Sequence, residues 1–135
     1  ERHPELIQIA ELFHAVSSEL HHHMMKEEKI LFPAIGQLQV IFKSKSAIRP
    51  SPFGTVRNPV AMMEMEHDSA GSFLKRMRVL SSNYTLPDDA CATYAVTYQK
   101  LNEFENDLHQ HIHLENNILF PKAIELEEKL SGHQK

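Results

Sequence analysis

The chain has 135 residues, of which 41% are apolar, and its formal net charge is −4. This length suits a single domain with one core, and the apolar content excludes a disordered chain. No apolar run approaches the ~18 residues that cross a membrane, and the scattered basic residues argue against nucleic acid as the main partner. The single cysteine, Cys91, excludes an internal disulfide and any site built from several cysteines, and it fits a cytoplasmic setting.

The spacing of apolar residues predicts an all-α chain with three long helices. Glycine is scarce, with four residues in the whole chain, and β-branched runs are short. The predicted helices run over residues 4–42, 58–82 and 87–130. The connections are a proline-containing loop over 44–58 and a short turn over 83–87. Long helices with such connections predict an antiparallel up-and-down bundle.

Two segments that lie 88 residues apart share the pattern H-x-x-x-E-x-x-I-L-F-P, at positions 23–33 and 111–121. Residues four apart lie on the same face of a helix. Apolar residues occur three and seven positions before each histidine, and Ile30 and Ile118 follow at seven positions after it. We therefore expect each histidine and glutamate to point into the core on this apolar face. We also expect the proline that ends each copy, Pro33 or Pro121, to bend its helix.

The predicted second helix carries a further candidate, His67, on a face that it shares with Val60, Met63 and Leu74. Three imidazoles and two carboxylates would then meet in the interior, where charge is costly unless it is paired or bound to a metal. Nitrogen and oxygen ligands without thiolate suit iron or manganese, with zinc as an alternative. Two carboxylates from opposing helices can bridge two metal ions. The sequence thus predicts a metal site made of His23, Glu27, His67, His111 and Glu115.

Simpler interpretations apply to the other residues of these types. A single H-x-x-x-E on a helix is usually a surface ion pair, but two copies on apolar faces favour metal binding. Glu64 stands three residues before His67, the spacing found in carboxylate-bridged bundles, but it has no counterpart in the repeat. Cys91 is interpreted as structural. The remaining histidines lie off the ligand faces and are interpreted as solvated or supporting residues; they include His14, His21, His22, His109, His113 and His133.

The segments 17–33, 63–71 and 111–121 resemble the haemerythrin-like domain of the Ric family, the iron–sulfur cluster repair proteins. The resemblance covers nearly the whole chain and implies one haemerythrin-like metal-binding domain over 1–135. It also implies a four-helix bundle with a non-haem di-iron centre, in which Glu27 and Glu115 bridge the irons. Proteins of this family act in bacteria under nitrosative or oxidative stress and are thought to supply iron to damaged iron–sulfur clusters.

The chain departs from the family pattern at its start. The family has two further histidine ligands, on a first helix and just after it, and a small domain with paired cysteines; all of these would precede Glu1. Because the chain starts without Met, we expect an N-terminally truncated fragment or a processed product that lacks the first of four helices. The groove left open predicts self-association into a homo-oligomer and incomplete metal occupancy.

Three functions share the predicted site. The first is iron donation for iron–sulfur cluster repair, with damaged iron–sulfur proteins as partners. The second is a haemerythrin-type carrier or sensor of oxygen or nitric oxide. The third is an oxidoreductase that acts on nitric oxide or peroxide, although the sequence supplies no separate acid–base pair for it. An open approach to the metal would favour donation, whereas apolar shielding would favour the carrier.

Overall fold

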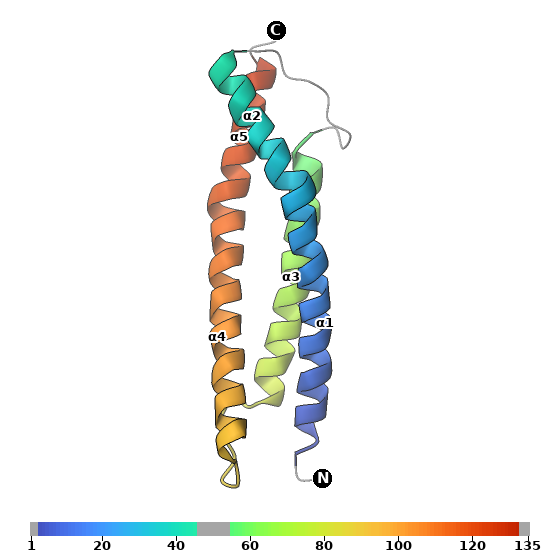
Figure 1. The fold of residues 1–135 in the computed structure, drawn as a ribbon, viewed down its shortest axis with the longest axis vertical. Coiled ribbons are helices and arrows are strands. Elements are labelled where there is room, and N and C mark those ends of the chain that lie inside the picture. The colour runs from blue at the N-terminus through green and yellow to red at the C-terminus, as the bar shows by residue number, and fades with distance from the viewer. Residues whose placement is uncertain (1–2, 46–54, 133–135) are drawn as a thin grey trace.

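The computed structural model describes residues 3–45 and 55–132, and the regular structure of these residues is entirely helical. Three long rods form an elongated bundle (Figure 1). The first rod consists of α1 (Glu5–Lys26), the π-helical turn η1 (Glu27–Leu31) and α2 (Phe32–Ser44). The second is α3 (Arg57–Leu80), and the third consists of α4 (Ala92–Leu114), the π-helical turn η2 (Glu115–Leu119) and α5 (Phe120–Gly132). The predicted all-α fold with three long helices is confirmed.

The rods alternate in direction: α1 and α4 run the same way, and α3 runs against both (Figure 1). The middle of the predicted loop over 44–58 lies outside the described residues. The second connection is longer than predicted, because α4 begins at Ala92 rather than near Pro87. Residues 87–90 form a turn instead, in which the Ala90 N–H donates to the Pro87 carbonyl at 3.1 Å. None of the helices in the described ranges is long and apolar enough to cross a membrane.

Among the described residues, the core consists of three apolar clusters that follow one another along the bundle. The first packs the start of α1 against the end of α3 and the start of α4, and it includes Ile9, Leu12, Met77, Tyr98 and Leu101. The middle cluster contains Val16, Ala70, Leu74 and Leu108. The third joins α2, the start of α3 and α5, and it includes Leu31, Ile35, Val60, Met63 and Phe120. The predicted metal ligands fall between the middle and third clusters.

Polar contacts fix α3 against the third rod at both ends. At one end, the guanidinium of Arg78 donates from Nε to Oε1 of the buried Glu105 at 2.9 Å. At the other end, the backbone N–H of Val56, the residue before α3, donates to Oε2 of Glu127 at 2.8 Å. This second contact satisfies one of the free N–H groups at the start of the helix. His67 lies between these two contacts, which therefore set its position along the bundle axis.

The irregularities expected near the two prolines are present as π-helical turns just before them, and the first rod changes direction between α1 and α2 (Figure 1). Each turn begins at the glutamate of the repeat. The N–H of Phe32 donates to the carbonyl of Glu27, and the N–H of Phe120 donates to the carbonyl of Glu115. These bonds span five residues instead of the four of an α-helix, so each turn contains one extra residue.

The extra residue explains why one expectation about the core is wrong. Ile30 and Ile118 were expected to share the face of the ligands, but their exposed fractions are 46% and 43%. One additional residue rotates everything after it by about 100° relative to a continuous α-helix. Leu31 and Phe120, with exposed fractions of 0% and 1%, take the core positions instead.

Candidate metal centre

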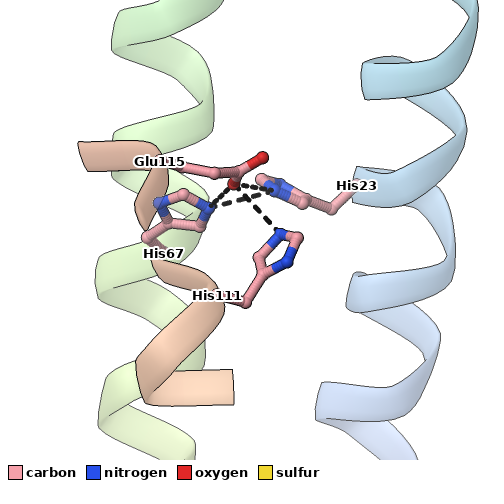
Figure 2. Close-up of side chains that lie close together, drawn as sticks. All are labelled: His23, His67, His111 and Glu115. Atoms are coloured by element: carbon pink, nitrogen blue, oxygen red, sulfur yellow. Dashed lines mark hydrogen bonds and ion pairs between the residues drawn. The ribbon is translucent and has the colours of Figure 1, made fainter. Parts of the chain in front are cut away.

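Side chains from all three rods meet between the middle and third clusters. Figure 2 shows His23 from α1, His67 from α3, His111 from α4 and Glu115 from η2 pointing toward one another. One candidate ligand atom from each of these residues lies within 4.8 Å of all the others. The rods thus bring together residues that are as far apart in sequence as 23 and 115.

The carboxylate of Glu115 lies at the centre of this group. Its Oε1 is 2.8 Å from His67 Nε2, 3.1 Å from His111 Nε2 and 3.8 Å from His23 Nε2. Oε1 of Glu27 lies beside it, 2.9 Å from His23 Nε2 and 3.5 Å from His111 Nε2. Both glutamates are buried. The structure therefore brings all five predicted residues together and places the two glutamates close to each other in the core; their role as metal ligands stays a prediction.

Several carboxylate oxygens in this centre lack a hydrogen-bond donor. Within the described residues, no donor reaches Oε2 of Glu27 or either oxygen of Glu115, although imidazole nitrogens lie close to the latter. The Nε2 atoms of His23 and His67 also face each other at 3.1 Å. Buried oxygens without donors are costly, and a bound cation would remove that cost. The donor set of imidazole nitrogens and carboxylate oxygens fits a metal such as iron, manganese or zinc.

The outer nitrogens of two imidazoles are held in place. His23 Nδ1 donates to Oε1 of Glu66 at 2.8 Å, and Oε2 of Glu66 accepts from Lys26 Nζ at 2.6 Å. His67 Nδ1 donates to Oδ1 of Asn116 at 2.8 Å. Because carboxylate and amide oxygens can only accept, each Nδ1 carries a proton. The Nε2 lone pair of each neutral ring therefore points at the centre, ready for a metal.

These surroundings shift the pKa values of the two imidazoles in opposite directions. Burial lowers the pKa of His23, but hydrogen bonds with Glu27 and Glu66 outweigh burial and raise this pKa above its ordinary value. Burial lowers the pKa of His67, and the hydrogen bond with Asn116 does not compensate for it. His23 therefore binds a second proton more readily than an ordinary histidine does. Metal binding is then expected to release this proton.

An aromatic ring of the repeat fixes the plane of His67. Phe120, the phenylalanine of the second I-L-F-P, stacks on the His67 imidazole with ring centroids 5.9 Å apart and planes inclined by 6°. The corresponding residue of the first copy, Phe32, is 43% exposed. The two copies are thus alike in backbone but differ in what surrounds them.

His111 marks the open side of the centre. Its side chain is 43% exposed, whereas that of His67 is 2% exposed. His111 follows Phe104 by seven residues and lies on the same helix face. Phe104 lines a groove between α1 and α4, whose walls also include Leu6, Phe13 and Val96. The centre therefore has one partly exposed candidate ligand, on the helix face that also carries Phe104.

The remaining polar candidates lie outside the centre. Glu64 is exposed and does not reach the site. The other histidines of the described ranges are also exposed, apart from the half-buried His3; those considered above are His14, His21, His22, His109 and His113, while His133 lies outside the described residues. Sequence reasoning missed Glu66 and Asn116, which hold the two imidazoles. Each directly adjoins a predicted ligand, and a polar residue beside a ligand was the available signal for both.

A helical bundle with buried imidazoles and carboxylates around one point defines a metal-binding bundle protein. Residues 1–123 match the family described as Hemerythrin HHE cation binding domain. The chain belongs to this family. The sequence-based expectation of a haemerythrin-like fold is thereby confirmed.

Similar proteins include several that are named for iron–sulfur cluster repair. The chain is 42% identical over 110 residues to the iron-sulfur cluster repair protein YtfE of Pectobacterium atrosepticum, an alignment that covers 82% of the chain and 44% of that protein. It is 41% identical over 109 residues to a probable iron-sulfur cluster repair protein of Haemophilus influenzae, covering 81% of the chain and 43% of that protein. The chain thus spans less than half the length of these curated relatives. Its resemblance to the haemerythrin-like domain of the repair proteins is confirmed.

The contact between Glu66 and His23 leads to a prediction about metal affinity. Glu66→Ala is expected to weaken Fe²⁺ binding by roughly 10–100-fold, because His23 loses the acceptor that orients its ring. Glu64→Ala removes an exposed carboxylate two residues away and is the matched control, expected to leave affinity unchanged. Anaerobic Fe²⁺ titration of both variants measures this. Equal affinities in the two variants would contradict a role for Glu66 in holding the ligand.

Proposed function

We propose that this chain holds a non-haem di-iron centre and donates iron for the repair of damaged iron–sulfur clusters. His23, His67 and His111 would supply nitrogen ligands, and Glu27 and Glu115 would bridge the two irons. The observation that carries the proposal is the central position of the two glutamates. They enter from different rods, lie beside each other, and keep three carboxylate oxygens without a hydrogen-bond donor among the described residues. These oxygens would be available as ligands, and two carboxylates from different rods form a donor set that could hold two ions.

The open side of the centre supports donation over a carrier function. An oxygen or nitric oxide carrier needs a metal that is shielded from water and stays bound. Here the imidazole of His111 is 43% exposed, which offers a path along which iron can leave. The names of the similar repair proteins point the same way, although those proteins are much longer than this chain.

The partners that we propose are proteins whose iron–sulfur clusters have been damaged by nitrosative or oxidative stress. We propose a cytoplasmic location for this reaction. The thiol of Cys91 is exposed and free, a state that is typical of a reducing compartment.

An iron-transfer experiment tests the proposed function. The iron-loaded chain is mixed with a protein whose [4Fe–4S] cluster has been degraded by nitric oxide, in the presence of sulfide, reductant and a ferrous chelator. We expect the cluster absorbance to recover while the iron content of the chain falls. Glu115→Ala, supplied with the same total iron, is expected to restore no cluster. Reversible binding of oxygen or nitric oxide without loss of iron would instead support the carrier.

A further inference from the structure

The metal ligands alone do not explain the I-L-F-P ending that both copies of the repeat share. In each rod, a π-helical turn runs from the candidate ligand glutamate to the leucine of this ending. The phenylalanine begins the next α-helix, and the proline is its second residue. Two rods with the same ending therefore place the same backbone irregularity at the same distance from the centre.

Packing explains why each rod needs one extra residue. Up to the first residue of the first turn, Val16, His23 and Glu27 lie on one buried face. Leu31, the last residue of the turn, and Ile35 continue that face into the third cluster. Removal of the extra residue would rotate α2 by about 100° and carry these side chains away from the cluster. The same holds for Phe120 and Ala123 in the other rod.

Packing does not by itself decide where along the rod the extra residue sits. A π-helical turn can move along a helix when one N–H exchanges a bond that spans five residues for a bond that spans four, or the reverse. Such movement needs an N–H at every position that the turn passes. Pro33 and Pro121 have none, so neither turn can move past its proline toward the C-terminus.

We propose that Pro33 and Pro121 are positioning residues that pin the π-helical turns against displacement toward the C-terminus, so that the turns begin at Glu27 and Glu115. This inference rests on the proposed metal centre, because its consequence is the placement of ligands. The pinned turn in the third rod holds Glu115 at its first position and Asn116, the acceptor for His67, at its second. Phe120, which stacks on His67, follows directly. A turn displaced by one residue would redirect both side chains that it carries.

Two variants, Pro33→Ala and Pro121→Ala, separate the effect of each proline on metal affinity from its effect on helix stability. Alanine is far more favourable than proline within a helix, so the metal-free variants are expected to unfold at the same temperature as the original chain or higher. Their affinity for Co²⁺ is nevertheless expected to fall by about tenfold or more, the loss typical of disturbed support around a metal. Pro4→Ala is the control. Pro4 stands at the start of α1, where proline is well tolerated, and this variant is expected to keep full affinity.

Hydrogen exchange tests the pinned turns even if the chain binds no metal. The amides of Phe32 and Phe120 donate to the glutamate carbonyls, and in the matching metal-free variant their hydrogen exchange is expected to quicken as the turn becomes free to move. Weaker Co²⁺ binding with unreduced unfolding temperature and faster exchange supports the inference. The inference is overturned if the variants keep both the Co²⁺ affinity and the hydrogen-exchange rates of the original chain. It is also overturned if both variants unfold at a lower temperature and this loss of stability accounts for their weaker Co²⁺ binding. If the original chain binds no Co²⁺, the metal centre is refuted, while the exchange data still test the pinned turn.

Discussion

Replacing Glu115 by alanine is expected to weaken metal binding by more than about a hundredfold, since even residues that only support a ligand typically contribute 10–100-fold. Glu115 lies at the centre of the site, with its Oε1 within 3.8 Å of three imidazole Nε2 atoms. His113→Ala is the matched control, because His113 lies two residues away and is exposed. Iron-to-protein ratios after anaerobic loading measure the effect. Equal ratios in the two variants would refute the assignment of Glu115 as a ligand.

Thermal unfolding adds a second measurement to this comparison. A ligand present at a hundred times its dissociation constant stabilises the folded state by about 2.7 kcal/mol. The original chain and His113→Ala are therefore expected to unfold at a higher temperature with metal than without. Glu115→Ala is expected to lose that difference. The metal-free variant should fold, since neither oxygen of Glu115 has a hydrogen-bond donor to lose among the described residues.

The pure 135-residue chain is expected to self-associate through the groove between α1 and α4. Leu6, Phe13, Val96 and Phe104 are among the apolar side chains that line it. If a helix covers roughly 600 Å² of such a groove, the burial contributes about 15 kcal/mol, an upper estimate. A soluble protein rarely leaves a patch of that size open. In a solution of this chain alone, we propose that the occupant is a second copy.

Two exposed valines allow a matched test of this association. Val96 lines the groove and is 53% exposed, whereas Val79 lies on α3 outside it and is 72% exposed. Val96→Lys is expected to shift the chain toward the monomer, and Val79→Lys is expected to leave its association unchanged. Light scattering during size-exclusion chromatography reads out the mass. A stable monomer of the original chain that retains two irons would contradict the proposed association.

The five residues of the centre could be predicted from sequence because helical spacing is regular up to each glutamate. His23 and Glu27 are four apart, as are His111 and Glu115, and in both pairs the residues three before the histidine face inward or partly inward. This regular spacing ends at the π-helical turns. The periodic pattern predicted Ile30 and Ile118 in the core, because such a pattern does not reveal one extra residue in a helix.

The residues that support the ligands were beyond the reach of spacing for a different reason. Glu66 and Asn116 each hold an imidazole that belongs to another rod. Which neighbouring rod a side chain meets depends on how the rods are rotated against each other, and that rotation comes from packing of the whole bundle. Glu64, with the spacing of a known ligand motif, is exposed for the same reason.

The repeated rods give the bundle an approximate internal symmetry. α1 and α4 run parallel, the rods to which they belong carry the same histidine, glutamate and π-helical turn, and α3 runs antiparallel to both (Figure 1). A pseudo-two-fold axis along the bundle would exchange the two rods. It would also carry α3 to a second position against the pair, and the apolar groove is lined by residues of these same two helices, α1 and α4.

This approximate symmetry predicts which side chains a helix in the groove would bring to the centre. His23 and Phe120 are buried on the side of α3, whereas their counterparts, His111 and Phe32, are each 43% exposed. Asn116 accepts from His67, while its counterpart Glu28 is exposed. A helix in the groove that mirrors α3 would offer an acceptor to His111 and a histidine to Phe32 and Glu28. We therefore propose that the occupant of the groove is a helix that runs antiparallel to both rods.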